Sequence, residues 1–223
     1  MAIIVAISKV SDGNMLIKSD KTNPEVINNR KKFLGKNGID INQATRINTI
    51  YEGSDYCRYE VVDSSQMGAG MIDGSVVTSD ALVTKNINHA LFLPIADCIG
   101  AVIYDSSKNI LMLSHLGRHM LEQNGGYKSV KFLIDNFNVR PADLSVWLSP
   151  APGLESYPLY KFNNRSLKDV AFKQLESAGI LPNSITDNTA DTSKDDNYFS
   201  HSEFLKGNRP SDGRFAIVAM MTD

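Results

Sequence analysis

Two apolar runs joined by a short polar segment constrain the fold of this 223-residue chain more than any other feature. The runs are IGAVIYD (99–105) and NILMLSH (109–115), and the polar stretch DSSKN joins them. Both are rich in β-branched and large apolar residues, and the first shows no alternation of polar and apolar positions. We therefore predict a β-hairpin within a sheet that is covered on both faces.

Similar patterns recur along the chain and indicate its fold class. Five further segments read as strands: 58–63, 80–84, 91–95, 143–148 and 213–221. Apolar residues at helical spacing predict three helices, at 23–35, 119–137 and 166–178. Because most strands precede the second helix, simple βαβ winding is not expected. We predict an α/β fold with mixed β-sheets flanked by helices, forming a single domain over residues 1–223.

Composition excludes several classes of function. Lys and Arg number 23 against 25 Asp and Glu, so the charge needed to neutralise many phosphates is missing and no nucleic-acid partner is expected. The start, MAIIVAISKVSDGN, is too short in its apolar part for a signal peptide, and no run approaches the roughly 20 apolar residues of a membrane span. We expect a cytoplasmic protein without a membrane partner, in which both cysteines are thiols.

The predicted hairpin brings one of these cysteines close to a histidine. Cys98 begins the first strand and His115 ends the second, so the two lie at the same end of the sheet, about 5 Å apart at Cα. They could share a metal, form a Cys–His nucleophile, or be a buried thiol beside a structural imidazole. We expect structural roles for Cys57 and His89, whereas the pattern around His201 leaves its role open.

Three short motifs, in order, carry a resemblance to a known family. They are DALVT (80–84), ADCIGAVIYD (96–105) and SHLGRHM (114–120), and together they resemble the laccase-domain family, also called YfiH-like or polyphenol oxidase family. Weaker likenesses lie near the start, in VSDGN and NPEVINNRKKFL, and near the end, in DNYFSHSEFLKGNRPSDGRFAIV. The resemblance therefore covers nearly the whole chain.

The resemblance implies a fold, a metal and a chemistry. Members have a single α/β domain with mixed sheets and bind one metal, usually zinc with copper as the alternative, through a His, a Cys and a second His. By resemblance, Cys98 and His115 are the second and third ligands. The implied reaction is phosphorolysis of purine nucleosides such as adenosine or inosine, with deamination of adenosine in some members, so the implied partners are a purine nucleoside and phosphate. Copper-dependent phenol oxidation and correction of peptidoglycan precursors are other activities associated with the family.

The sequence departs from the family at three places. Tyr51 stands where the first metal histidine is expected, and a phenol with a pKa near 10 is a poorer zinc ligand than imidazole. In HLGRH, Arg118 and His119 replace a Trp and an Arg, so His119 becomes a replacement ligand or an anion contact at a predicted helix start. Glu203 stands where a cation is expected, which weighs against phosphate binding.

The leading hypothesis is a metal-dependent purine nucleoside enzyme. Its metal would be held by Cys98 and His115, with Tyr51 or His119 as the third ligand, and would activate water or orient phosphate. Arg118, which we place with Cys98 and His115 in the catalytic set, would neutralise the anionic nucleophile, as would Arg214 or the helix terminus. One alternative is a diverged, non-catalytic member that has lost the metal and binds a partner. A further alternative is a metal-free Cys/His hydrolase or a peptidoglycan-precursor editing enzyme.

Overall fold

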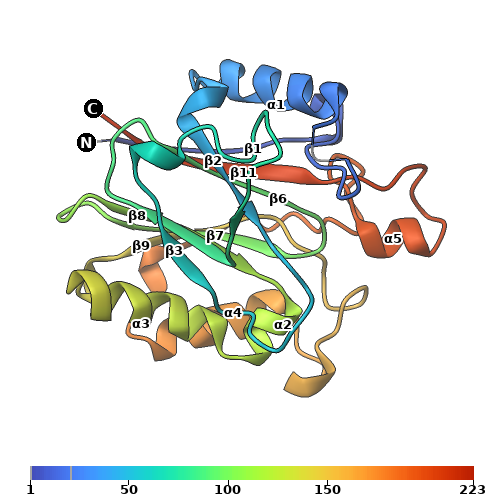
Figure 1. Ribbon diagram of the computed structural model, residues 1–223. Coiled ribbons are helices and arrows are strands. Elements are labelled where there is room, and N and C mark those ends of the chain that lie inside the picture. Colours follow the sequence, from blue (N-terminus) through green and yellow to red (C-terminus); the bar gives the residue numbers. More distant parts are fainter. Residues whose placement is uncertain (1, 21) are drawn as a thin grey trace.

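Two β-sheets packed face to face form the centre of the molecule (Figure 1). The structure is a computed structural model that describes residues 2–20 and 22–223. The first sheet consists of β1 (Ala2–Ile7), β2 (Ala44–Asn48), β4 (Val77–Thr78), β6 (Ala90–Ile95) and β11 (Phe215–Thr222). The second sheet consists of β3 (Tyr59–Val61), β5 (Ala81–Thr84), β7 (Ile99–Asp105), β8 (Ile110–Leu116), β9 (Ser145–Leu148) and β10 (Ile185–Asp187).

Both sheets are mixed, as predicted. The first has the order β1-β11-β6-β2-β4, antiparallel from β1 to β6 and parallel from β6 to β4. The second has the order β10-β9-β7-β8-β5-β3, with an antiparallel centre and one parallel pair at each edge. The predicted hairpin is thus the β7–β8 pair in the middle of the second sheet, and it is confirmed.

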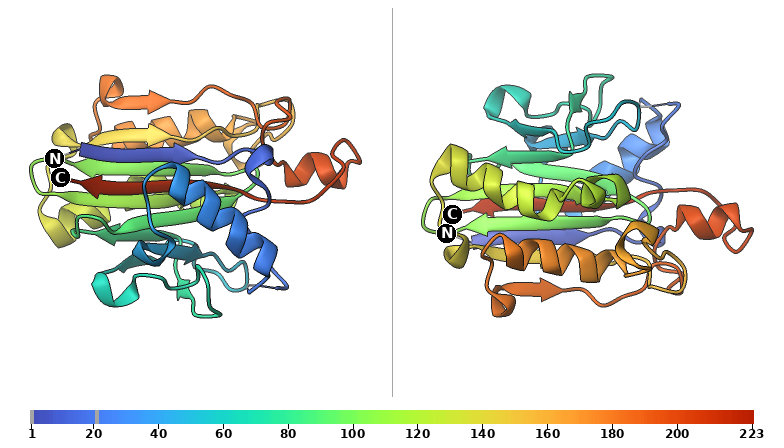
Figure 2. Two further views of the ribbon diagram at one scale, coloured as in Figure 1. Left: turned by 90° about the horizontal axis from the view of Figure 1, so that it is seen from above. Right: turned by 90° about the horizontal axis from the view of Figure 1, so that it is seen from below.

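The outer faces of the two sheets are covered by α1 (Pro24–Lys36), α2 (Arg118–Glu122), α3 (Gly125–Phe137) and α4 (Leu167–Ser177), whereas α5 (His201–Leu205) lies at one end of the molecule. Helix α1 lies across the first sheet, whereas α2, α3 and α4 lie under the second (Figures 1 and 2). One apolar cluster fills the space between the sheets and two more lie beneath the helices. Every residue of β7 and β8 is buried, because the sheet between these layers has no face in water.

The first helix begins as its sequence predicts. The Asn23 side chain accepts hydrogen bonds from the backbone N–H groups of Glu25 and Val26, and Pro24 occupies the first helical position. Within the described part of the chain, none of the helices is long and apolar enough to cross a membrane.

The predicted helix over 119–137 is wrong in one respect, because the structure divides it into α2 and α3. Asn124 separates them with a left-handed φ of 64°, which ends the first helix and turns the chain. The next two residues are glycines in close contact with neighbours: a Cβ at Gly125 would lie 2.7 Å from the Met120 carbonyl oxygen, and one at Gly126 would lie 3.0 Å from the Gln174 side chain. Strands β1, β2, β4 and β10 lie outside the predicted segments.

Candidate active site

The β7–β8 hairpin sets the positions of the predicted cysteine and histidine. Gly100 pairs with His115, so Cys98, just before β7, lies level with Gly117, just after β8. The predicted direct pairing of Cys98 with His115 is therefore displaced by two residues, although both still lie at the same end of the sheet. At the other end of the hairpin, Asp105 accepts hydrogen bonds from backbone N–H groups of the loop.

Gly117 leaves the space in which the two side chains meet. A Cβ added at this position would lie 2.9 Å from the His115 ring and 3.1 Å from Cys98 Sγ. The imidazole and the thiol are thus packed against the same backbone atom. A larger residue at position 117 would force one of them to move.

Burial keeps both groups neutral at pH 7. His115 is 4% exposed, and neither of its ring nitrogens has a hydrogen-bond partner among the described residues. Burial lowers the pKa of His115 to about 4, with Asp80 opposing the change. Burial, followed by the charge of Asp97, raises the pKa of Cys98 to about 12. The site therefore presents a thiol and a neutral imidazole with unused hydrogen-bonding capacity.

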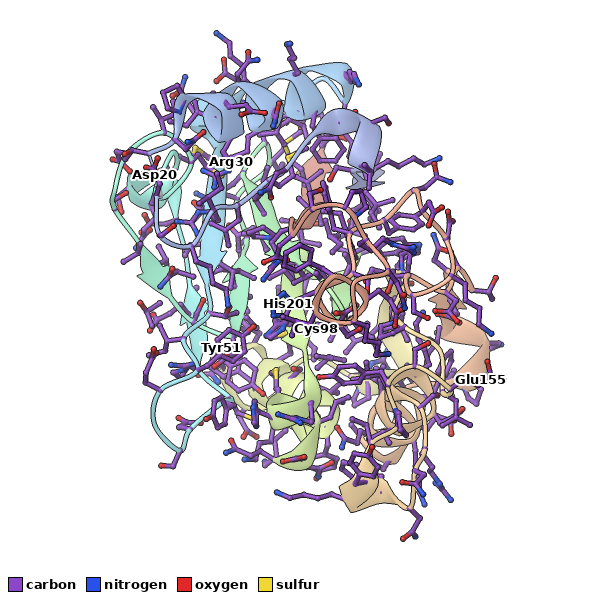
Figure 3. The ribbon with its side chains drawn as sticks, turned by 90° about the vertical axis from the view of Figure 1, so that its right-hand side faces the viewer. Asp20, Arg30, Tyr51, Cys98, Glu155 and His201 are labelled. Atoms are coloured by element: carbon purple, nitrogen blue, oxygen red, sulfur yellow. The ribbon has the colours of Figure 1, made fainter. Side chains whose placement is uncertain are left out.

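Tyr51, which the resemblance places at the first ligand position, lies beside this pair. Its ring stands edge-on to the His115 ring at a centroid distance of 6.4 Å, and Lys18 Nζ lies 4.6 Å from the Tyr51 ring centre. Figure 3 shows Tyr51 and Cys98 on the same side of the molecule, with His201 next to Cys98. Burial raises the pKa of Tyr51 to about 12, and Cys98 adds to the effect, so the phenol stays protonated.

Arg118 and His119 follow β8 in the short helix α2. The His119 ring stacks on Tyr56 with centroids 4.6 Å apart, and Nε2 of His119 lies 3.4 Å from Nη2 of Arg118. With only five residues, α2 does not supply the anion-binding helix terminus that the sequence suggests. Arg118 itself lines the pocket described next.

A pocket of about 380 Å³ opens above the Cys98–His115 pair. This volume lies within the roughly 300–1,000 Å³ range of small-molecule sites. Its walls contain all the predicted site residues: Tyr51, Cys98, His115, Arg118, His119 and Arg214. Four other lining residues, Lys18, Tyr56, Asp97 and Tyr157, are not among the predicted site residues. Of these, only Asp97 had a local signal, since it directly precedes Cys98 in the ADC motif.

Asp97 attaches the start of α5 to the pocket. Its carboxylate accepts hydrogen bonds from Ser200 Oγ at 2.7 Å and from the backbone N–H of Ser202 at 2.6 Å. His201 stands between Ser200 and Ser202 in the sequence, and its Nδ1 lies 3.0 Å from Oδ1 of Asp212. The same oxygen pairs with Nη1 of Arg214 at 2.6 Å. One pocket wall is thus held by charge-assisted hydrogen bonds.

The residues present do not complete the metal site that the resemblance implies. Cys98 and His115 suit two ligand positions, because thiolate sulfur and imidazole nitrogen are the usual zinc ligands and the His115 nitrogens are unpartnered. Catalytic zinc, however, uses three protein ligands, and no group of three or more His, Cys, Asp or Glu side chains in the described ranges could hold a metal ion. His119 is engaged with Tyr56, and Tyr51 would have to lose a proton that its environment retains. The same argument applies to copper.

Three other residues singled out by the sequence have structural surroundings. His89 is fully buried and contacts the hydroxyls of two threonines, and the half-buried Cys57 packs against the core under the second sheet. Glu203 accepts hydrogen bonds from Lys206 and Asn208 and lies outside the residues that line the pocket. Glu203 is therefore no argument against phosphate binding in this pocket.

The fold and the site define a class of two-sheet α/β proteins in which a cysteine and a histidine meet at the end of a central hairpin. The chain belongs to the family described as multi-copper polyphenol oxidoreductase laccase, whose family model matches residues 5–165. No curated protein sequence matches the chain.

Solved structures share this fold at low sequence identity. The hypothetical protein YfiH of Bacillus licheniformis is 20% identical, with a TM-score of 0.85 over 99% of this chain and 93% of that one. YlmD of Geobacillus stearothermophilus is also 20% identical, with a TM-score of 0.87 over 99% and 92%. A Neisseria meningitidis protein of the family DUF152 is 16% identical, with a TM-score of 0.71 over 99% and 95%. These likenesses show that the two-sheet fold is common to all four proteins.

Proposed function

We propose that this chain is a purine nucleoside enzyme that cleaves adenosine or inosine with phosphate in the Cys98–His115 pocket. The observation that carries the proposal is the pair of buried, unpartnered ring nitrogens of His115 at the pocket floor. Buried polar atoms in native proteins nearly always have partners, and an unpaired one costs roughly 1–3 kcal/mol. A ligand with several hydroxyls and ring nitrogens, such as a nucleoside, would supply hydrogen-bond partners for the two ring nitrogens of His115.

The lining residues suit both parts of the reaction. Tyrosine rings at positions 51, 56 and 157 offer aromatic surface to a base. Lys18, Arg118 and Arg214 bring three cations to a pocket that also contains the carboxylates of Asp80 and Asp97, and these cations are the groups that could meet an anionic nucleophile. Of the two arginines, Arg214 is already paired with Asp212, so Arg118 is the better placed to meet an anion.

The reaction would proceed without a thiolate or a protein-bound intermediate. A phosphate oxygen forms a bond to C1′ of the sugar, the bond from C1′ to the base nitrogen breaks, and the electron pair stays on the base. Dihydrogen phosphate supplies the proton that the leaving base takes up. His115 and the protonated Cys98 would hold the nucleoside by hydrogen bonds, and Arg118 would stabilise the charge on the attacking phosphate.

The test is phosphate-dependent release of free base. Purified protein is incubated with inosine or adenosine, with and without phosphate, and base and ribose 1-phosphate are separated by chromatography. We expect both products only with phosphate, loss of activity in Cys98→Ala, and full activity in Cys57→Ala, the matched control for the other thiol. Base release that is absent, or unchanged in Cys98→Ala, would reject the proposal. Inosine formed from adenosine without phosphate would instead show deamination.

The incomplete metal site favours a second candidate, a family member that binds a nucleoside or a partner without catalysis. It predicts nucleoside binding with no product in the same assay. A Cys98 nucleophile gains no support, because burial keeps its thiol protonated at neutral pH.

A further inference from the structure

Two arginines lie side by side beneath α1, away from water. Arg30 is 0% exposed and Arg46 is 1% exposed. Arg30 Nη1 and Arg46 Nε both donate hydrogen bonds to the carbonyl oxygen of Gly70, at 3.1 and 2.6 Å. Figure 3 shows Arg30 between α1 and the level of Tyr51 and Cys98. Two guanidinium groups therefore converge on one backbone atom.

Neither arginine has a negative partner. Among the ion pairs of the described residues, none includes Arg30 or Arg46, and Nη2 of each has no hydrogen-bond partner. Burial and then the charge of Arg46 lower the pKa of Arg30 to about 9, and burial also lowers the pKa of Arg46. A guanidinium group is charged in proteins at pH 7. Buried charges are normally paired, so this arrangement lacks an anion.

Arg46 also lines a groove that adjoins the candidate active site. Side chains alternate along β2, so Arg46 and Asn48 face the same side of the first sheet. Both line a groove of about 240 Å³, together with Lys18 and, as its one carboxylate, Glu52. The groove and the pocket above Cys98 share five lining residues: Leu16, Lys18, Thr49, Tyr51 and Pro94. A ligand in the pocket could therefore extend into the groove, or meet a second ligand there.

We propose that Arg46, Lys18 and Asn48 form a subsite for a phosphate group, with Arg30 adding positive charge from behind. The guanidinium matches phosphate oxygens in shape, the ammonium adds a point charge and the amide adds a neutral donor. The phosphate is either the inorganic co-substrate, which Lys18 would share with Arg118 because both also line the pocket, or the ester of a nucleoside monophosphate. This inference rests on the proposed function, since phosphorolysis requires a place for phosphate.

Phosphate binding to the full chain, measured by calorimetry at constant ionic strength, tests the subsite without requiring turnover. We expect wild-type protein to bind one phosphate, and both Lys18→Gln and Arg46→Gln to lose at least tenfold in affinity. Glu52→Gln should bind more tightly, because it removes the one negative charge in the groove. The matched control is Lys32→Gln, which removes an exposed charge on the outer side of α1. Arg46 is buried, so Arg46→Gln could fail to fold. Lys18→Gln changes a residue outside the core, so this variant alone still tests the subsite.

Competition identifies the source of the phosphate group. If phosphate and inosine bind together, phosphate is the co-substrate; if inosine monophosphate displaces phosphate and loses affinity in Lys18→Gln, the group belongs to a nucleotide. Either result supports the subsite. Wild-type protein that binds neither ion nor nucleotide, or variants that bind as wild type does, would overturn it. Protein that binds phosphate through Lys18 and Arg46 but releases no base would reject phosphorolysis and leave the subsite standing.

Discussion

Replacing Tyr51 with histidine should create the metal site that the chain lacks. Tyr51 already lies beside His115, with ring centroids 6.4 Å apart, so an imidazole at this position would join Cys98 and His115 as a third ligand. We expect Tyr51→His to bind close to one zinc per chain, whereas wild-type protein and Tyr51→Phe bind far less.

The size of the effect follows from protonation. A phenol with a pKa near 10 must lose a proton to ligate zinc, and at pH 7 this costs about 4 kcal/mol. Because Tyr51 is 46% exposed, we use the pKa near 10 of a solvated phenol for this figure. The surroundings of Tyr51 raise its pKa to about 12, which increases the free energy needed to deprotonate it. An imidazole is largely neutral at pH 7 and escapes the cost. The substitution should therefore tighten zinc binding by about a thousandfold.

Elemental analysis after dialysis, followed by competition with a chelating dye at pH 7, measures the change. Tyr56→His is the matched control, since it adds an imidazole to the same pocket at the residue that stacks on His119. Equal zinc affinity in Tyr51→His and Tyr51→Phe would refute the placement of Tyr51 at the third ligand position. One tightly held zinc in wild-type protein would refute the conclusion that its site is incomplete.

Three other predictions concern stability. Gly117→Ala should destabilise the fold by about 1–3 kcal/mol in urea unfolding, because its Cβ would press on the imidazole and the thiol, whereas Gly35→Ala, with no atom within 4 Å, should not destabilise it. Burial lowers the pKa of His89 from 6.5 to about 4, so the unfolded chain binds a proton that the folded chain does not. The free energy of unfolding should fall by up to about 3 kcal/mol as pH drops through that window, less so in His89→Gln, and an identical pH profile would contradict this. Asp97→Ala should cost about 1–3 kcal/mol by leaving the Ser200 hydroxyl and its neighbouring N–H unpaired, whereas Asp97→Asn, which tolerates the left-handed φ of 63°, should cost less in the same assay.

The parts of the fold with strong local signals were predictable. The apolar runs at 99–105 and 109–115 required burial on both faces, and the cap at Asn23 fixed the start of α1. Strand β2 could not be found in this way, because ATRIN carries polar side chains that need tertiary partners: Arg46 is buried and donates a hydrogen bond to the carbonyl oxygen of Gly70, 24 residues away in the sequence. Local propensity cannot report such contacts.

In the candidate site, too, some residues have a local sequence signal and others depend on tertiary packing. The hairpin brought Cys98 and His115 to one end of a sheet, and the resemblance to the laccase-domain family pointed to Tyr51. Lys18, Tyr56 and Tyr157 reach the pocket from segments that are distant in sequence and have no motif of their own. Their contribution depends on how loops pack, so a single sequence could not predict it. The division of the second helix at Asn124 likewise depended on a left-handed turn and on the close approach of Gly126 to Gln174.

The most direct test of the account asks whether a nucleoside contacts His115. Inosine is titrated into protein carrying ¹⁵N-labelled histidine, and the imidazole nitrogens of His115 are followed by NMR. We expect one ring nitrogen to shift as it gains a hydrogen bond, with saturation at one inosine per chain and no change at the fully buried His89. Inosine that fails to bind, or that binds while the His115 signals stay unchanged, would contradict the placement of the nucleoside in this pocket.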